Sequence, residues 1–318
     1  MADYKGIKGF KVESLASDPT ANEGQIWYNT ASYALKYDAV GAGAWASGGA
    51  LNTGTNQNVG FGTQTAGLSA TGNSAAGNSL TVTEEYNGSA WTEVNVTNDP
   101  RYGAGGAGTQ IAAIIFGGFK QIGGVPSGAQ VETETYDGTS WTEVADLPVA
   151  RNDTMGAGTT TAAICFGGHP VPTMPADTVS WNGSSWSAAN DLQGGTAFAA
   201  AFGTQTAALT AGGGPSYPAL DTAEIYDGTS WSEQNDFGGS TSPFPGGGAV
   251  AVTEEWNGTS WTEVADMATE RGKLAGANAA PNTLSMAMGG NEDNSPSLGT
   301  LTEEWSGAPA VVKTVTVS

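Results

Sequence analysis

The chain is poor in cysteine and histidine, with one of each among its 318 residues. The single cysteine, Cys165, forms no disulfide within the chain, so nothing marks an oxidising compartment. Its setting, AAICFGG, is that of a small core residue. The single histidine, His169, is too few for most zinc cages, which need several histidine or cysteine ligands. The sequence therefore predicts no metal and no cofactor.

Basic residues are also scarce: 10 lysine and arginine residues stand against 31 acidic ones, for a net charge of −21. Such a surface repels phosphate backbones and anionic lipid, so we expect no nucleic-acid partner. No apolar run is long enough to span a membrane, and the start, MADYKGIKGFKVES, lacks the apolar core of a signal peptide. We expect a soluble protein with no membrane insertion and no export signal.

A twelve-residue motif recurs along the chain. TEEYNGSAWTEV at 83–94 returns as TETYDGTSWTEV at 133–144, AEIYDGTSWSEQ at 223–234 and TEEWNGTSWTEV at 253–264. The aromatic that marks each copy lies at Tyr37, Tyr86, Tyr136, Trp181, Tyr226, Trp256 and Trp305. The steps between these positions are 49, 50, 45, 45, 30 and 49 residues. A repeat of this length indicates a solenoid, propeller or array.

Asn-Gly or Asp-Gly stands at the centre of the motif and predicts a β-hairpin. In a type I′ turn both central residues take positive φ, which these residues tolerate. The segment TEEY then forms one strand and WTEV the next.

A second piece precedes the hairpin: GAGTQIAAIIFGG at 106–118, GAGTTTAAICFGG at 156–168 and AFGTQTAALTAGG at 201–213. The apolar stretch is too short for a stable helix and is bracketed by glycine, so we expect two short strands. Small side chains suit strands near a crowded axis, where backbones approach closely.

Four strands in 45 to 50 residues cannot bury both faces alone, and stacking in a ring removes most exposed edges. We therefore expect an all-β fold, a β-propeller of about seven (six to seven) four-stranded blades. The short step before Trp256 predicts that one blade is short. An open solenoid is the main alternative, but neither end shows a polar capping repeat.

The repeats resemble the kelch family of propellers. The resemblance extends roughly over residues 60–310 and is most complete from Arg101 to Val144. The segment GQIWYNTASYALKY, from residue 24, resembles a short module of bacteriophage tail-fibre and appendage proteins. Repeats rich in GTQTAA and EEYNGTSW are likewise similar to virion proteins of marine phages. The resemblance implies a docking arm at 1–23 that includes Lys5, Lys8 and Lys11; a frayed, solvated terminus is the alternative.

The predicted divisions follow the repeats. They are a docking arm at 1–23, tail-fibre-like first strands of the propeller at 24–48, and blades at 50–98, 101–148, 151–192, 194–237, 240–267 and 271–318.

No residue set predicts catalysis. Arginines recur in one slot of the repeat, which indicates a structural role, and we expect them to pair with the strand glutamates. The residues are Arg101, Arg151 and Arg271 with Glu84, Glu134, Glu254 and Glu303. The acidic loop GGNEDNSPS offers oxygen ligands for calcium, but it lacks the spacing of known calcium loops. We expect a protein that is not an enzyme.

Loops that join the second and third strands of each unit should share one face, and they differ while the hairpins hardly vary. They span 73–79, 119–130, 169–178, 214–221 and 291–299. Varied loops on a uniform scaffold are typical of recognition surfaces. The candidate recognition residues are Phe119, Lys120, His169, Tyr217, Asn291 and Asp293.

The interpretation is a bacteriophage virion structural protein, a tail fibre, knob or appendage that presents a propeller for host recognition or particle assembly. Its expected partners are other virion proteins through the arm and a host-surface glycan or protein, with a symmetric homo-oligomer on the particle. The alternative is a soluble bacterial lectin or protein-interaction propeller.

Overall fold

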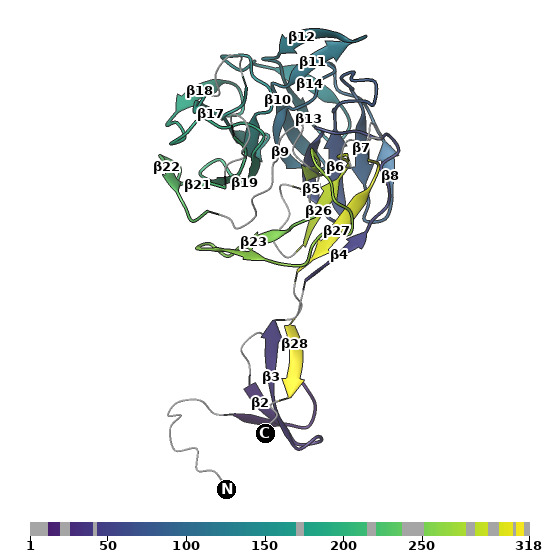
Figure 1. Ribbon diagram of the computed structural model, residues 1–318, viewed down its shortest axis with the longest axis vertical. Coiled ribbons are helices and arrows are strands. Elements are labelled where there is room, and N and C mark those ends of the chain that lie inside the picture. The colour runs from purple at the N-terminus through teal and green to yellow at the C-terminus, as the bar shows by residue number, and fades with distance from the viewer. Residues whose placement is uncertain are drawn as a thin grey trace. The chain divides into compact units, whose positions relative to one another are not determined.

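The computed structural model describes residues 12–19, 26–40, 43–169, 175–214, 221–236, 251–277, 284–291, 299–307 and 310–314. The chain divides into two compact units: unit 1 comprises Met1–Ala44 with Ser306–Ser318, and unit 2 comprises Trp45–Trp305. The elements in the described ranges are strands (Figure 1). No helix that could cross a membrane is found in these ranges. The expectation of an all-β fold is therefore confirmed.

Six sheets in the described part of unit 2 follow the sequence repeat and are numbered here 1 to 6; a further two-stranded sheet lies within the second repeat. Sheet 1 comprises β5(Val59–Thr63), β6(Ala66–Ala70), β7(Thr83–Tyr86) and β8(Trp91–Glu93); sheet 2 comprises β9(Gly105–Thr109), β10(Ala112–Phe116), β13(Thr133–Tyr136) and β14(Trp141–Val144). Sheet 3 comprises β15(Met155–Thr159), β16(Ala162–Phe166), β17(Thr178–Trp181) and β18(Trp186–Ala189); sheet 4 comprises β19(Ala200–Thr204), β20(Ala207–Ala211), β21(Ala223–Tyr226) and β22(Trp231–Glu233). Sheet 5 has β23(Glu254–Trp256) and β24(Trp261–Glu263) among the described residues. Sheet 6 comprises β25(Ala275–Gly276), β26(Leu284–Met288), β27(Thr302–Ser306) and β4(Ala44–Ser47).

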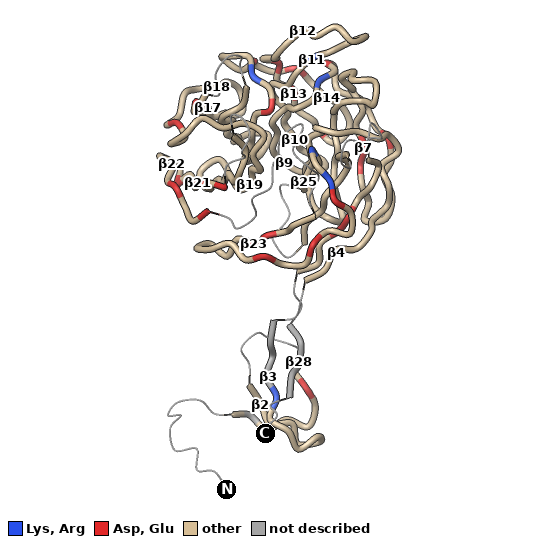
Figure 2. The backbone as a smooth tube through the Cα atoms, viewed as in Figure 1, with Lys and Arg blue, Asp and Glu red and all other residues tan. Residues whose placement is uncertain are grey.

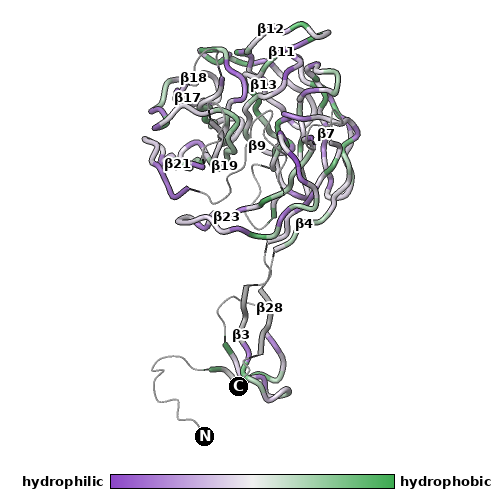
Figure 3. The backbone as a smooth tube through the Cα atoms, viewed as in Figure 1, coloured by the Kyte–Doolittle hydropathy of each residue, from purple (hydrophilic) through white to green (hydrophobic). Residues whose placement is uncertain are grey.

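The alanine-rich segments form the first two strands of their sheets, as predicted, and the first strands of neighbouring sheets lie side by side. Glycine is needed where they meet: a Cβ on Gly60 would lie 2.4 Å from the carbonyl oxygen of Gly276, and one on Gly156 would lie 2.8 Å from that of Gly106. Hydrophobic segments lie among these strands, as at β19 (Figure 3). The small side chains therefore permit the close backbone approach that was expected.

The hairpins form as predicted, but the turn is of another type. Tyr86 pairs with Trp91, and the four residues between them form the turn. Gly88 has a φ of +90°, whereas Asn87 does not have positive φ. Instead the Asn87 Oδ1 accepts hydrogen bonds from the backbone N–H of Ser89 and of Ala90, both at 3.0 Å. The prediction of a type I′ turn is wrong, because the side chain of Asn or Asp itself holds the turn.

A tryptophan at the start of the last strand links one sheet to the next. Trp141 of sheet 2 donates from Nε1 to the Thr83 Oγ1 of sheet 1 at 3.1 Å, and both residues are buried. The same bond joins Trp186 to Thr133, Trp231 to Thr178, Trp91 to Thr302 and Trp45 to Thr253. Five hydrogen bonds of one kind therefore connect sheets 2 to 1, 3 to 2, 4 to 3, 1 to 6 and 6 to 5.

The hydrophobic core lies between sheets. One cluster combines Phe61 and Leu68 of sheet 1 with Ile115, Tyr136 and Trp141 of sheet 2. Equivalent clusters lie between sheets 2 and 3, between 3 and 4, and between 6 and 1. Each sheet is therefore stabilised mainly by its neighbours, as expected for a repeat unit that cannot bury both faces alone. The expected burial of Cys165 is also found, in the cluster between sheets 2 and 3.

The expected pairing of arginine with strand glutamate occurs at two of the three slots. The buried Arg101 guanidinium contacts the Glu134 carboxylate, and Arg271 Nη2 lies 3.1 Å from Glu303 Oε1. Arg151 has Val179 at the glutamate position, and its Nη1 donates to two backbone carbonyls instead. The arginines therefore hold strands together from inside the sheets, and this geometry gives no support to a carboxylate-binding cluster.

Unit 1 is built from both ends of the chain. Its sheet has the order β1-β2-β3-β28, with β1(Glu13–Leu15), β2(Ile26–Asn29), β3(Ala34–Val40) and β28(Ala310–Thr314). The strand β1 pairs parallel with β2, and the other pairs are antiparallel. We expected residues 24–48 to supply the first strands of the propeller. Instead β2 and β3 pair with β1 and β28, and only β4 joins unit 2.

The network around Asp18 explains the GQIWYNT motif. The Asp18 carboxylate accepts hydrogen bonds from Trp27 Nε1 at 3.2 Å, Asn29 Nδ2 at 2.6 Å and Lys36 Nζ at 2.7 Å. The Lys36 ammonium, followed by the Asn29 amide, lowers the pKa of Asp18. Trp27 and Asn29 are buried. The motif therefore fixes the turn and the edge of this small sheet.

The bond between tryptophan and threonine predicts a large cost for removing one hydroxyl. The substitution Thr83→Val keeps the shape of the side chain but leaves the buried Trp141 Nε1 without an acceptor, which costs about 1–3 kcal/mol. Urea denaturation measures this loss directly. The control is Thr142→Val on the exposed face of β14, which should stay within about 0.5 kcal/mol of the parent. Equal stability of the two variants would contradict the linking role.

Candidate functional site

A residue just before the first strand links neighbouring sheets through the backbone in five of the six sheets. The Phe198 N–H donates to the Asp153 carbonyl, Asp153 to Gly103, Gly103 to Gln57, and Gln57 to Lys273. These five, called here the linking residues, all have positive φ, between 51° and 60°. They come from sheets 4, 3, 2, 1 and 6 in turn, so one chain of hydrogen bonds gathers them at one end of unit 2.

For four of the five linking residues, the residue before it forms a pair with the residue after the Gly-Gly, or Thr-Gly in sheet 1, that closes the second strand. These flanking pairs are Asn56 with Asn73, Tyr102 with Phe119, Asn152 with His169, and Gly272 with Asn291. Three predicted recognition residues, Phe119, His169 and Asn291, therefore occupy equivalent positions in sheets 2, 3 and 6. The structure brings these three to the same end of unit 2 as the linking residues.

Lys120 follows Phe119 and has a different role. Its Nζ lies 2.5 Å from the Asp99 Oδ1, and both side chains are about one quarter exposed. The segment predicted as a loop at 119–130 is a hairpin of β11(Phe119–Ile122) and β12(Val125–Ala129). Lys120 therefore serves first to hold this hairpin to the preceding segment.

Several predicted residues lie outside the described residues: Tyr217, Asp293, Lys5, Lys8 and Lys11. Asn291 is thus the described member of the acidic loop that was considered for calcium. Within the described ranges, no three His, Cys, Asp or Glu side chains are grouped so that they could hold a metal ion.

Asp153 is the buried carboxylic acid at the end of unit 2 that holds the linking residues. Its carboxylate accepts a hydrogen bond from Gln57 Nε2 at 3.0 Å and another from the Asn152 amide. Burial raises the pKa of Asp153 to about 7, although the two amides and the charge of Lys273 act in the opposite direction. Burial also lowers the pKa of Lys273 and raises that of Tyr102, and both side chains feel the charge of Asp153. Asp153 therefore changes charge near neutral pH, in electrostatic contact with three sheets.

Gln57, Tyr102, Asp153 and Lys273 were missed by sequence reasoning. The signal that could have found Tyr102, Asp153 and Lys273 is the slot after each repeated arginine, where RYG, RND and RGK vary; Gln57 has no such arginine before it. A Cβ on Gly103 would lie 2.4 Å from the Asp153 Oδ1, so this glycine makes room for the carboxylate. A position that varies next to a recurring arginine is thus the sequence signal for these three side chains.

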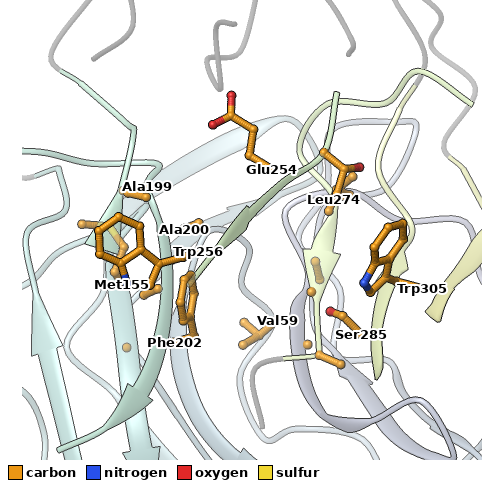
Figure 4. Close-up of a pocket in the computed structure, with 18 of the residues that line it drawn as sticks. Val59, Met155, Ala199, Ala200, Phe202, Glu254, Trp256, Leu274, Ser285 and Trp305 are labelled. Atoms are coloured by element: carbon orange, nitrogen blue, oxygen red, sulfur yellow. The ribbon is translucent and has the colours of Figure 1, made fainter. Parts of the chain in front are cut away.

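A cavity of about 650 Å³ lies next to the linking residues. Its wall includes the residue that follows each of them, such as Ala104, Thr154 and Leu274, together with the first strands of the sheets. Trp256 and Trp305 lie on opposite sides of it, and Glu254 lies near Trp256 (Figure 4). Glycine, alanine and larger apolar side chains make up most of the lining, so few polar groups face the cavity.

The last strand of the hairpins carries acidic side chains. Exposed glutamates occupy the same position in four sheets: Glu93, Glu143, Glu233 and Glu263. Figure 2 shows acidic segments along the strands β21, β22 and β23. This side of unit 2 is unsuited to anionic partners, whereas the end with the linking residues carries both charges and neutral amides.

Comparisons with known proteins identify the fold alone. No protein family and no curated protein matches the sequence. The solved structure of YjhT is similar, with a TM-score of 0.67 over 84% of this chain and 99% of that chain. The two sequences are 14% identical. Together with the four-stranded sheets, this similarity assigns the chain a propeller-like, kelch-like all-β fold.

The raised pKa of Asp153 predicts that stability depends on pH. The folded state holds this proton up to about pH 7, whereas the unfolded chain releases it near 3.8. Between these values the folded state binds more protons, so stability falls as pH rises. The variant Asp153→Asn lacks this dependence, so its Tm relative to the parent should rise between pH 5 and pH 8. A constant difference in Tm across this range would contradict the assignment.

Proposed function

We propose that unit 2 is a closed propeller of six blades, the lower end of the range expected from the repeat. The support is the order of the tryptophan bonds, which run from sheet 4 back to sheet 1, from sheet 1 to sheet 6 and from sheet 6 to sheet 5. Sheet 6 itself combines β4 from the start of unit 2 with three strands from its end. A ring closed by strands from both ends leaves only short, protected sheet edges.

We further propose that the protein is a structural component of a bacteriophage particle that recognises the host surface through the end with the linking residues. The observation that carries this proposal is the contrast within that end. The backbone is repeated from sheet to sheet, with similar φ and the same kind of hydrogen bond, but the linking residue is a different amino acid in each of the five sheets. A uniform frame with varied side chains is the usual design of a recognition surface.

Unit 1 is the proposed attachment module. Its GQIWYNT segment is the part that resembles phage tail-fibre proteins, and the Asp18 network gives that segment a fixed shape. Ile26 and Tyr33 remain 52% and 82% exposed on its surface, where they are available to a neighbouring particle protein. Lys5, Lys8 and Lys11 belong to the same unit and add positive charge for an acidic neighbour.

A binding role rather than catalysis is proposed for the recognition end. Asp153 is bonded to amides, and the other side chains there are amides, aromatics, one lysine and His169, which pairs with Asn152. No nucleophile with an adjacent base is present among the described residues of this end. The second candidate is a bacterial lectin, which the aromatic pair Tyr102–Phe119 beside amide side chains favours.

The test uses particles and purified full-length chain. Peptides of the chain should be detected by mass spectrometry in particles purified from infected host cultures, and the purified chain should reduce adsorption of these particles to host cells. Absence from the particles would contradict the virion assignment. Binding to cells by a chain that is absent from particles would select the lectin.

A further inference from the structure

We propose that the recognition end binds a neutral sugar ring, held by the flanking pairs of sheets 6, 1 and 2 together with Lys273. This inference rests on the proposed recognition function and names the chemical class of its ligand. It follows from the polar groups that the described structure leaves without partners, from one aromatic pair, and from backbone conformations that cost free energy.

The three sheets present their side chains as one continuous arc. The Gln57 N–H donates to the Lys273 carbonyl, which joins sheet 1 to sheet 6, and the Gly103 N–H donates to the Gln57 carbonyl, which joins sheet 2 to sheet 1. The Ser79 Oγ also donates to the Phe119 carbonyl at 3.1 Å. The flanking pairs of these sheets therefore lie next to one another.

The arc contains acceptors that have no donor. The amide oxygens Oδ1 of Asn56, Asn73 and Asn291 are buried and accept no hydrogen bond in the described structure. Asn56 is only 6% exposed. A buried acceptor left unpaired costs about 1–3 kcal/mol, and a group this rare in folded proteins calls for a partner. Hydroxyl groups of a ligand can supply the missing donors.

The same arc contains donors that are free. Neither the Lys273 ammonium nor the Tyr102 hydroxyl makes a hydrogen bond within the described part of the chain, and both side chains are half-buried. Lys273 is not within ion-pair distance of Asp153, although the two interact electrostatically. A ligand here must therefore accept as well as donate hydrogen bonds.

These groups select against charged ligands. A metal cation would be repelled by the ammonium of Lys273 beside the amide oxygens. A phosphate or sulfate is normally held by several cationic groups, and Lys273 is the single lysine or arginine among the linking residues and flanking pairs. A neutral polyhydroxylated molecule satisfies both the free acceptors and the free donors.

Tyr102 and Phe119 supply an apolar surface. Their ring centroids lie 5.4 Å apart at an interplanar angle of 40°, and both are half-exposed. The C–H face of a sugar ring is apolar and packs on such rings, while a tyrosine also presents a polar hydroxyl. A stacked ring with polar groups around it is the arrangement expected of a small-ligand site.

Backbone conformation gives independent support. Gln57, Asp153, Phe198 and Lys273 hold positive φ, which costs a residue with a Cβ about 1–2 kcal/mol. Gly103, at the same position in sheet 2, shows that glycine fits this conformation. Such costs gather where a ligand is held, and here they place the side chains of Gln57 and Lys273 in the arc.

The test uses the full chain and a panel of neutral oligosaccharides of glucose, galactose, mannose and N-acetylglucosamine. Saturation-transfer NMR and calorimetry should detect binding of at least one of them. Tyr102→Ala and Asn73→Leu should each weaken that binding about tenfold or more, and Lys273→Met should weaken it less. Thr142→Val on the exposed face of β14 is the control and should leave it unchanged. Thermal melts check that each variant is folded.

The outcomes separate this inference from the proposed function. If no neutral sugar binds, or if Tyr102→Ala and Asn73→Leu bind as the parent does, the sugar site is wrong even when the chain is found on particles. A rise in Tm with calcium that Asn73→Leu abolishes would show a cation site instead. Sugar binding by a chain absent from particles would support the site and contradict the virion role.

Discussion

The indole of the hairpin tryptophan is the contact on which the architecture of unit 2 depends. Its ring fills the space between two sheets, as Trp231 does against Phe166, and its N–H needs a buried acceptor, which the threonine of the preceding sheet provides. Packing alone would allow the sheets to slide, because apolar contacts have no direction. The hydrogen bond fixes the register of each sheet against its neighbour, and the same solution is repeated at five junctions.

Fixing the outer strands in this way leaves the first strands to meet near the centre. There the side chains must be small, as at Gly60 and Gly156, and the backbone itself provides the bonds. Each residue in the chain of N–H to carbonyl bonds through Gln57, Gly103 and Asp153 takes positive φ. At the end with the linking residues the backbone makes the connections between sheets, so the residue there can differ from one sheet to the next.

Much of this scaffold could be predicted from the sequence, because it depends on residues that repeat. The hairpins, the two short alanine-rich strands and the pairs of Arg101 and Arg271 with glutamate follow from fixed spacing. The turn type was missed, since a side chain such as Asn87 replaces a backbone conformation. The sheet of unit 1 was missed as well, because β28 and β3 lie at opposite ends of the chain and no local pattern joins them. The candidate site was only half visible: Phe119, His169 and Asn291 were found as loop residues, but their partners differ from sheet to sheet.

The proposed binding role rests on how the side chains vary at the end with the linking residues. A core position is recognised by its uniformity, as at Thr83, Thr133 and Thr178, which all do one task. The linking positions show the opposite: the backbone is uniform, glycine is tolerated once, and the other residues accept an unfavourable φ. If these side chains only stabilised the fold, the least costly residue would be glycine in every sheet. Gln57 and Asp153 bond to each other within the chain, whereas Lys273 makes no hydrogen bond among the described residues, so it is Lys273 above all that the proposed ligand would contact.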